Sequence, residues 1–148
     1  NITETAEFNV YVDAESLSIV LDLEIPKLFV GWDAIMNKGF LTRQDTNYLK
    51  NSDSSLAKFA MRCTQSLDEY NQKLGFDGFE LADPTAMIAA IWPEMMTKCI
   101  PAYATVETKN EDNYGQVYLD LSSKTPNATI CIDINPDLFK KYLFQSLL

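Results

Sequence analysis

The sequence predicts an α/β fold, and two neighbouring features carry that prediction. Asp13 stands before an amphipathic stretch that runs to about Leu23, with apolar residues spaced as on one helix face. After Pro26, the short apolar run 27–30 ends at Gly31, a pattern typical of a strand buried on both faces. A helix followed directly by a buried strand indicates a layered α/β architecture.

Two further helices are predicted in the middle of the chain. Thr42 with Asp45 resembles a capping box and opens a short helix to about Lys50. A longer helix is predicted over residues 55–73, because its apolar residues recur at spacings of three and four. Residues 75–79 hold two glycines and two aromatic residues and are predicted to form a loop.

The stretch around Asp83 predicts a loop that leads straight into a buried helix. Asp83 has the features of an N-cap, and Pro84 suits the first helical position, where its missing N–H is no loss. The helix is expected to end near Trp92. A carboxylate held at the start of a helix suits a cap, and it also suits a metal ligand, so both interpretations stay open.

The last third of the chain changes its hydrophobic period to two. Residues 102–108 and 115–121 are predicted to be antiparallel strands joined by a polar turn at 109–113. Residues 129–134 predict another strand, and Asn135 caps a final amphipathic helix. No internal repeat or interdomain linker divides the sequence, so we expect a single domain.

Composition narrows the possible functions. The 148 residues are 47% hydrophobic and 22% charged, which is typical of a globular chain. The net charge of −9 argues against nucleic-acid binding and is compatible with binding a cation. No apolar run approaches the roughly 20 residues that span a membrane. Histidine is absent, which removes the usual general base and the commonest zinc ligand.

Cysteines and sequons suggest a compartment. The three cysteines, Cys63, Cys99 and Cys131, have no metal-binding spacing, and their pairing is left open. The sequons at Asn1 and Asn127, together with the lack of an initiating Met, favour a secreted, glycosylated protein with a processed or trimmed N-terminus.

The groups able to do chemistry fall in two places, the polar N-terminus with Glu7 and Asn9, and Asp83. By themselves these are more often an ordinary loop and a helix cap. Tyr70 and the other large aromatic residues are more often core or lid residues than ligand contacts. Glycine-rich phosphate loops and Cys/His or Ser/His pairs are absent.

The order of the motifs is more informative than any single one. The chain opens with Ala6-Glu7-Phe8-Asn9-Val10-Tyr11-Val12-Asp13-Ala14-Glu15 and continues with Phe29-Val30-Gly31-Trp32-Asp33. Much later come Ala82-Asp83-Pro84-Thr85-Ala86 and Val106-Glu107-Thr108. This series resembles the C-terminal half of the inosine–uridine nucleoside hydrolase family, and the resemblance runs through essentially the whole chain.

The resemblance implies a fold, a reaction and a set of roles. The fold is an open, mixed and mostly parallel sheet with flanking helices and a calcium ion at the carboxyl ends of its strands. The reaction is cleavage of the N-glycosidic bond of nucleosides to base and ribose. Asn1 then matches a substrate asparagine, Glu7 the ligand of the ribose 5′-hydroxyl, and Asn9 a second ribose-binding residue. Asp83 matches a calcium ligand that also contacts the ribose hydroxyls, and Tyr70 loosely matches an aromatic residue near the base.

Two departures from the family pattern shape the expectation. The Asp-rich N-terminal signature is missing, so a separate N-terminal chain of the same precursor, or a missing segment, is expected to complete the domain. Ala82 stands where many relatives have a histidine that protonates the departing base, which favours purine nucleosides bound by stacking. Relatives form dimers or tetramers, so further homo-oligomeric assembly is expected.

Two functions follow from these observations. The first is a secreted, calcium-dependent nucleoside hydrolase subunit in which no residue of this chain is confidently catalytic. The alternative is a catalytically inactive relative that binds ligands or serves as a structural protein, and Ala82 is its main support.

Overall fold

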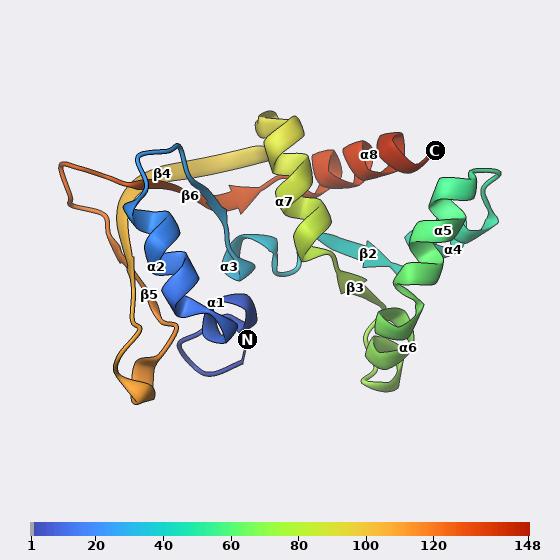
Figure 1. Cartoon of the computed structure of the whole chain (residues 1–148). Helices are drawn as coiled ribbons and strands as arrows, with labels where there is room; N and C mark the ends of the chain where they lie inside the picture. The colour runs from blue at the N-terminus through green and yellow to red at the C-terminus, as the bar shows by residue number, and fades with distance from the viewer. Residues whose placement is uncertain (1) are drawn as a thin grey trace. The chain divides into compact units, whose positions relative to one another are not determined.

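The computed structural model describes residues 2–148, which form two compact units (Figure 1). The first unit holds residues 2–32 and 98–132, and the second holds residues 33–97 and 133–148. The chain passes from one unit to the other within α3 (Trp32–Ile35), β4 (Met96–Val106) and β6 (Ala128–Ile134).

A mixed sheet and the helix α2 (Ala14–Asp22) make up most of the first unit. The strand order is β1-β6-β4-β5, where β1 is Leu28–Val30 and β5 is Val117–Asp120. β1 runs parallel to β6, and β5 runs antiparallel to β4. The fold class is therefore the expected α/β class with a mixed sheet, whose parallel part in this chain is the β1–β6 pair.

Small side chains let α2 pack closely on this sheet. Leu21 of α2 is buried in one cluster with Ala102 and Ala104 of β4 and with Ala128 and Ile130 of β6. Alanines under a helix keep the two layers close, so Leu21, with the partly buried Leu17, fills the space between them. This cluster fixes which face of the sheet α2 covers.

Strand β1 corrects one prediction. The apolar run after Pro26 does form a strand, but it is not buried on both faces, because Leu28 is 41% exposed and Phe29 and Val30 are half-buried. β1 is the last strand in the sheet order and pairs only with β6 within residues 2–148. Its residues have the composition of a buried parallel strand, while this chain covers them only in part.

The N-terminal segment corrects a second prediction. Instead of the ordinary loop that its polar residues favour, residues Phe8–Val12 form the short helix α1. Glu7 has extended backbone angles, φ −81° and ψ 149°, and caps α1, while Asp13 caps α2 as expected. Five helical residues are too few to show a helical period in the sequence.

The second unit is mainly helical. Its helices are α4 (Arg43–Asn51), α5 (Ser55–Cys63), α6 (Gln65–Lys73), α7 (Ala82–Ile91), the 3-10 turn η1 (Pro93–Met95) and α8 (Pro136–Leu147). The capping box of Thr42 and Asp45 opens α4 as predicted, and Asn135 caps α8 as predicted. The 3-10 turn η2 (Glu111–Asn113) lies in the first unit.

A two-stranded antiparallel sheet replaces part of the predicted 75–79 loop. β2 (Phe40–Thr42) pairs with β3 (Gly78–Glu80), with Leu41 opposite Phe79. Gly78 has φ +143°, and a Cβ there would lie 1.9 Å from the carbonyl oxygen of Leu41. The glycine that suggested a loop is therefore the residue that lets two backbones approach in a strand pair.

The predicted helix over residues 55–73 is divided at Thr64 into α5 and α6. The Thr64 backbone leaves helical geometry at φ −94° and ψ 3°, and its hydroxyl donates to the carbonyl oxygen of Ala60 at 3.2 Å. A threonine side chain that bonds back to the preceding turn competes with the helical ladder. The apolar residues keep their helical spacing on both sides of Thr64, so the sequence pattern does not reveal the break.

No helix within residues 2–148 is both long and apolar enough to cross a membrane.

Candidate functional site

Asp83 lies in the first turn of α7, but it is not the N-cap. Leu81 takes that position, and no side chain caps the helix. The buried Thr85 explains the shift, because its backbone N–H and its hydroxyl both donate to the Leu81 carbonyl oxygen, at 3.1 and 2.6 Å. The helix thus starts one turn before Thr85, and Asp83 becomes its second residue.

The Asp83 carboxylate is exposed and forms no hydrogen bond or ion pair within residues 2–148. Its place near the helix start puts it at the positive end of the helix dipole. Of the two interpretations left open for this residue, the cap is wrong. The carboxylate oxygens remain available to a ligand.

The start of α7 is held rigidly by its neighbours. The Leu81 N–H donates to the carbonyl oxygen of Gly39 at 2.8 Å, next to the β2–β3 pair. Gly39 lies against the helix, since a Cβ there would come within 2.5 Å of the Thr85 hydroxyl. Asp83 is therefore presented by a short, well-packed junction between β3 and α7.

Glu7 is held in a different way, by capping α1. Its Oε2 accepts hydrogen bonds from the backbone N–H of Asn9 at 2.9 Å and of Val10 at 3.4 Å. Both donors use the same oxygen, so Oε1 has no hydrogen bond within the described residues. The Asn9 side chain is exposed beside it in sequence.

This N-terminal arm, residues 2–12, is fastened to the β4–β5 hairpin. Ala6 pairs with Gln116 in an isolated antiparallel bridge. Gly115, with φ +79°, lies close to Tyr11, whose Cα would be 3.0 Å from an added Cβ. The rings of Tyr11 and Tyr114 meet edge to face at 5.7 Å. The arm is therefore a packed element that fixes Glu7 and Asn9 on the first unit.

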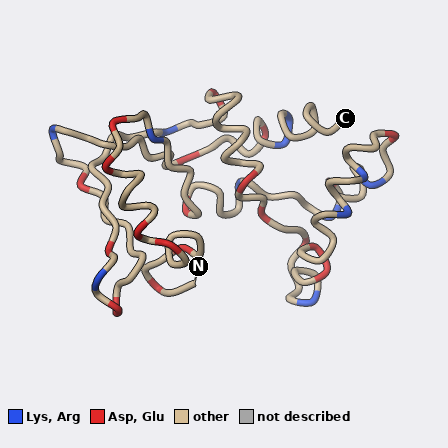
Figure 2. Tube along the Cα trace, viewed as in Figure 1, with Lys and Arg blue, Asp and Glu red and all other residues tan. Residues whose placement is uncertain are grey.

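Negative charge is concentrated in the N-terminal segment. Residues 2–24 contain no Lys or Arg, and Figure 2 shows acidic positions recurring along the arm and α2. The Tyr114 hydroxyl donates to Glu15 at 2.5 Å, and this hydrogen bond raises the pKa of Tyr114. A segment with this charge attracts cations and repels anions.

The predicted site residues are divided between the two units. Glu7 and Asn9 belong to the first unit, whereas Asp83 and Tyr70 belong to the second. Tyr70 lies on α6 with 61% of its surface exposed, so it is not a core residue. Asn1 lies outside the described residues. Their assembly into one ribose site remains a prediction.

A calcium ion prefers 6–8 oxygen ligands. Within residues 2–148, no three Asp, Glu, Cys or His side chains come together as a group that could hold a metal. The described residues therefore contain no such group of three. The Asp83 oxygens, without partners within residues 2–148, are of the hard-oxygen type that calcium prefers.

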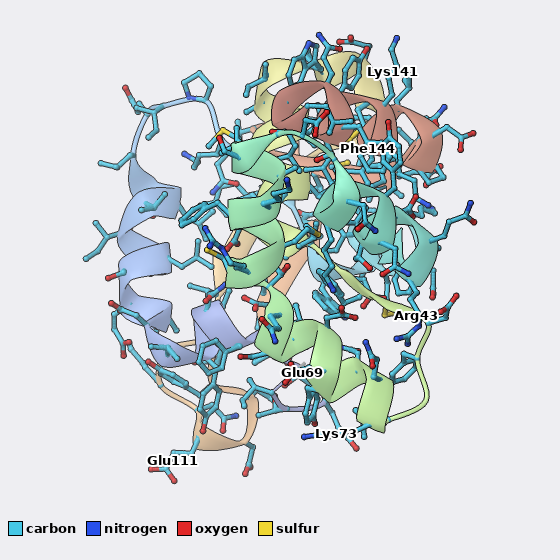
Figure 3. The ribbon with its side chains drawn as sticks, turned by 90° about the vertical axis from the view of Figure 1, so that its right-hand side faces the viewer. Arg43, Glu69, Lys73, Glu111, Lys141 and Phe144 are labelled. Carbon is cyan, nitrogen blue, oxygen red and sulfur yellow. The ribbon has the colours of Figure 1, made fainter. Side chains whose placement is uncertain are left out.

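Sequence reasoning missed a cavity of about 610 Å³ in the second unit. α4, α5 and α6 line it with Lys50, Lys58, Arg62 and Asp68 among others. Figure 3 labels Glu69, which also lines the cavity, and Lys73 at the end of α6. The Lys50 ammonium donates a hydrogen bond to the buried Asp68 carboxylate at 2.9 Å. This ion pair links α4 to α6. No sequence motif marked these residues.

Asn127 has a structural role that its sequon did not reveal. Its side-chain oxygen accepts from the backbone N–H of Ala104 at 2.7 Å, and its nitrogen donates to the carbonyl oxygens of Ala104 and Leu21 at 3.0 and 3.4 Å. A glycan on this nitrogen would replace one of these bonds. Glycosylation at Asn127 stays a prediction.

Comparisons with known proteins agree with this fold. The family model described as inosine-uridine preferring nucleoside hydrolase matches residues 1–141. The pyrimidine-specific ribonucleoside hydrolase RihA of Citrobacter koseri is 30% identical over 152 residues, covering 99% of this chain and 48% of that protein. The same enzyme of Salmonella newport gives the same identity and coverage.

Solved structures share the fold at lower identity. A plant nucleoside hydrolase, PpNRh1, matches with a TM-score of 0.87 and 22% identity over 97% of this chain and 48% of that chain. A purine-preferring ribonucleoside hydrolase from Gardnerella vaginalis matches with a TM-score of 0.83 and 18% identity over 95% of this chain and 45% of that chain.

These matches define a class of α/β proteins, the nucleoside hydrolase fold. The chain belongs to the inosine-uridine preferring nucleoside hydrolase family. It spans about half the length of the curated relatives it matches, in agreement with the C-terminal half that the motif order indicates.

Proposed function

We propose that this chain is the C-terminal part of a calcium-dependent nucleoside hydrolase, which cleaves the N-glycosidic bond of ribonucleosides to base and ribose. The family match over residues 1–141 carries the proposal. The structure adds that Asp83 and Glu7, two family-matched carboxylates, both keep oxygen atoms without partners within residues 2–148.

The chemistry needs groups that hold the sugar and tolerate positive charge. Cleavage of a glycosidic bond passes through an oxocarbenium-like transition state. In this proposal the Oε1 atom of Glu7 accepts a hydrogen bond from a ribose hydroxyl. The exposed amide of Asn9 both accepts and donates hydrogen bonds to ribose hydroxyls. These bonds orient the ring. Fixed orientation is a large part of such catalysis. The acidic arm around them favours a cationic transition state over a neutral ground state.

Asp83 would contribute one calcium ligand and accept a hydrogen bond from a ribose hydroxyl. A bound calcium ion lowers the pKa of its water and so supplies a nucleophile near neutral pH. The rigid junction between β3 and α7 keeps the Asp83 oxygens in a fixed place. Preorganised ligands of this kind avoid rearrangement during the reaction.

Polypeptide outside these 148 residues is proposed to supply the remaining calcium ligands and the base that activates water, either as a separate N-terminal chain of the same precursor or as a further segment. The half-length match to the relatives supports this assembly. The partly covered strand β1 supports it too, because a strand of this composition is usually buried on both faces. Further homo-oligomerisation of the assembled unit is part of the proposal.

Secretion is proposed from the sequons at Asn1 and Asn127. Treatment of the native protein with an N-glycosidase tests it, since loss of mass from either peptide shows passage through a glycosylating compartment. An unchanged mass at both peptides contradicts the glycoprotein assignment.

Ala82 favours a second candidate function. It is the first residue of α7, next to Asp83, and its methyl group cannot protonate a departing base. A relative that binds nucleosides without cleaving them would keep Glu7, Asn9 and Asp83 and lack this acid. If the enzyme is active, Ala82 favours a base held by stacking, as for a purine, although two relatives carry the name pyrimidine-specific.

An assay of the complete native protein tests these proposals. Ribose release from inosine and from uridine is measured with calcium, after chelation, and after calcium is restored. Activity that disappears on chelation and returns with calcium supports the hydrolase, and the faster substrate gives the base preference. Bound calcium and nucleoside without ribose release supports the inactive binding protein. Absence of both calcium and nucleoside binding overturns both functions.

A further inference from the structure

The first unit carries two cysteines on neighbouring strands. Cys99 lies on β4 and Cys131 lies on β6, and these strands are adjacent in the sheet order. Cys99 is exposed, whereas Cys131 is 3% exposed. Nothing in the proposed hydrolase chemistry uses either thiol.

The two cysteines lie on the same face of the sheet. Ala102 of β4 and Ile130 of β6 belong to the cluster under α2. Successive side chains of a strand point to opposite faces, so positions an odd number of residues away lie on the other face. Cys99 is three residues from Ala102, and Cys131 is one residue from Ile130. Both therefore lie on the face that α2 does not cover.

Hydrogen bonds near the two ends of the strand pair give its direction, and those at one end give the register of the cysteines. The Asn135 N–H donates to the Met95 carbonyl oxygen at 2.8 Å, and the Thr97 hydroxyl donates to the Asp133 carboxylate at 2.8 Å. Ala102 and Ala128 keep this register, since both belong to the cluster under α2. Beyond them the Asn127 N–H donates to the Ala102 carbonyl oxygen at 3.1 Å, which is a shift of one residue at the end of the pair. Partners therefore descend along β4 as they ascend along β6, which makes the pair antiparallel. Two residues inward from Thr97 and Asp133 are Cys99 and Cys131, which places the two cysteines opposite each other.

Opposed residues in an antiparallel pair have Cα atoms roughly 4.5 or 5.5 Å apart. Disulfides join residues whose Cα atoms are roughly 4.4–6.8 Å apart, so this pair can be bridged without moving the strands. Cys63 lies on α5 in the second unit and is outside this arrangement.

We propose that Cys99 and Cys131 form a redox-dependent disulfide between β4 and β6, in which Cys99 is the entry thiol and Cys131 the resolving thiol. A small oxidant such as glutathione disulfide reaches the exposed residue first. The Cys99 thiolate attacks one sulfur of glutathione disulfide, forms a mixed disulfide and releases one glutathione thiolate. The Cys131 thiolate then attacks the Cys99 sulfur, forms the protein disulfide and releases the second glutathione thiolate. Two thiols are oxidised, one glutathione disulfide is reduced, and two protons pass to solvent.

The bridge joins two central strands of the sheet across the 31 residues between the cysteines, which include the β4–β5 hairpin that holds the N-terminal arm. Closing this loop lowers the entropy of the unfolded chain. Oxidation is therefore expected to raise the Tm of the protein by roughly 5–10 °C. This inference is independent of the proposed hydrolase activity.

Peptide mapping of the complete native protein tests the proposal, with Cys63→Ser as the matched control. The protein is reduced, transferred to glutathione disulfide, blocked with an alkylating reagent and digested without reductant. A linked Cys99–Cys131 peptide is expected in both the native protein and the control. Alkylated Cys99 and Cys131, or a link from either residue to Cys63, overturns the proposal.

The order of reaction is tested with two single variants. Cys131→Ala is expected to accumulate glutathione on Cys99, because the resolving thiol is missing. Cys99→Ala is expected to leave Cys131 unmodified, because its thiol is buried. Equal glutathione incorporation at both positions overturns the assignment of roles. The linked peptide in native protein remains the primary readout if either variant does not fold.

Discussion

Glu7 and Asp83 are both carboxylates near the start of a helix, yet the chain uses them differently. Glu7 caps α1 and gives one of its oxygens to two backbone donors. Asp83 caps nothing, and within residues 2–148 both of its oxygens are without partners. The Oε2 atom of Glu7 thus has a local structural role. No interaction within the described residues occupies the Asp83 side chain, so it is the stronger candidate for contact with a ligand.

The two carboxylates also depend on different supports. Asp83 follows β3, whose pairing with β2 requires the glycine at position 78. Glu7 depends on the contact of the N-terminal arm with Gly115 on the hairpin. Each half of the candidate site can therefore be disturbed separately.

Gly78→Ala is expected to have the largest effect, destabilising the protein by about 3 kcal/mol. The new Cβ would lie 1.9 Å from the Leu41 carbonyl oxygen at φ +143°, which β2 and β3 cannot accommodate while paired. Denaturant unfolding measures the change. The control is Gly75→Ala, where φ is +86° but nothing lies within 4 Å of the new atom, and about 1 kcal/mol is expected. Equal losses for both variants would show that β2–β3 pairing does not depend on Gly78.

Asp83→Asn is expected to lower kcat/KM for ribonucleosides by about 10²-fold, the upper end of what disturbing a metal site usually costs. Its Tm should change little, because the side chain is exposed and without partners in the described chain. Asp137→Asn is the matched control, since Asp137 is the exposed second residue of α8. Similar activities for the two variants would remove Asp83 from the site.

Glu7→Gln is expected to lower kcat/KM about tenfold, as for the loss of one charged hydrogen bond to the substrate. The amide oxygen still accepts from Asn9 and Val10, so the cap of α1 survives. Asp13→Asn is the control, because Asp13 caps α2 in the same manner. An unchanged kcat/KM in Glu7→Gln would leave Glu7 with its capping role alone.

The smallest effect is expected from the ion pair between Lys140 of α8 and Asp45 of α4. Burial raises the pKa of Asp45, but hydrogen bonds from Lys140 and Thr42 outweigh it and hold that pKa below its ordinary value. A lowered folded-state pKa stabilises the protein above the unfolded value near 3.8 and ceases to do so as pH falls through the folded value.

Lys140→Met should therefore lose on the order of 1 kcal/mol of stability at neutral pH and little at pH 2. The control is Lys141→Met, on the same helix but without a carboxylate hydrogen bond of its own within residues 2–148. Urea midpoints at both pH values measure the difference. A loss of the same size at pH 2 would contradict the ionic origin of this contribution.

Several elements were predictable because their causes are local. Asp13 caps α2, Thr42 and Asp45 form the capping box of α4, and Asn135 caps α8, each by hydrogen bonds to residues two or three positions away. The alternation that predicts strands near residues 102–108 and 129–134 is also local, and both strands were found.

The wrong predictions share a different cause. Gly78 suggested a loop, but Leu41, far away in sequence, makes its neighbourhood a strand pair. Asp83 suggested a cap, but the contacts of Thr85 and Gly39 start α7 earlier. Thr85 is a near neighbour of Asp83, but Leu41 and Gly39 are far from Gly78 and Asp83 in sequence, and the local patterns do not include them.

By itself, the sequence determined the α/β class, the family and the candidate residues Glu7, Asn9 and Asp83. Motif order and capping residues involve near neighbours in the chain, so they can be read directly from the sequence. Only the tertiary structure decided that Glu7 is partly used in capping, that Asp83 is without a partner within residues 2–148, and that Cys99 faces Cys131. The Glu7 cap is local, but α1 has only five residues and shows no helical period in the sequence. The places of Asp83 and of the two cysteines depend on contacts between distant residues, and such contacts leave no periodic signal in the sequence.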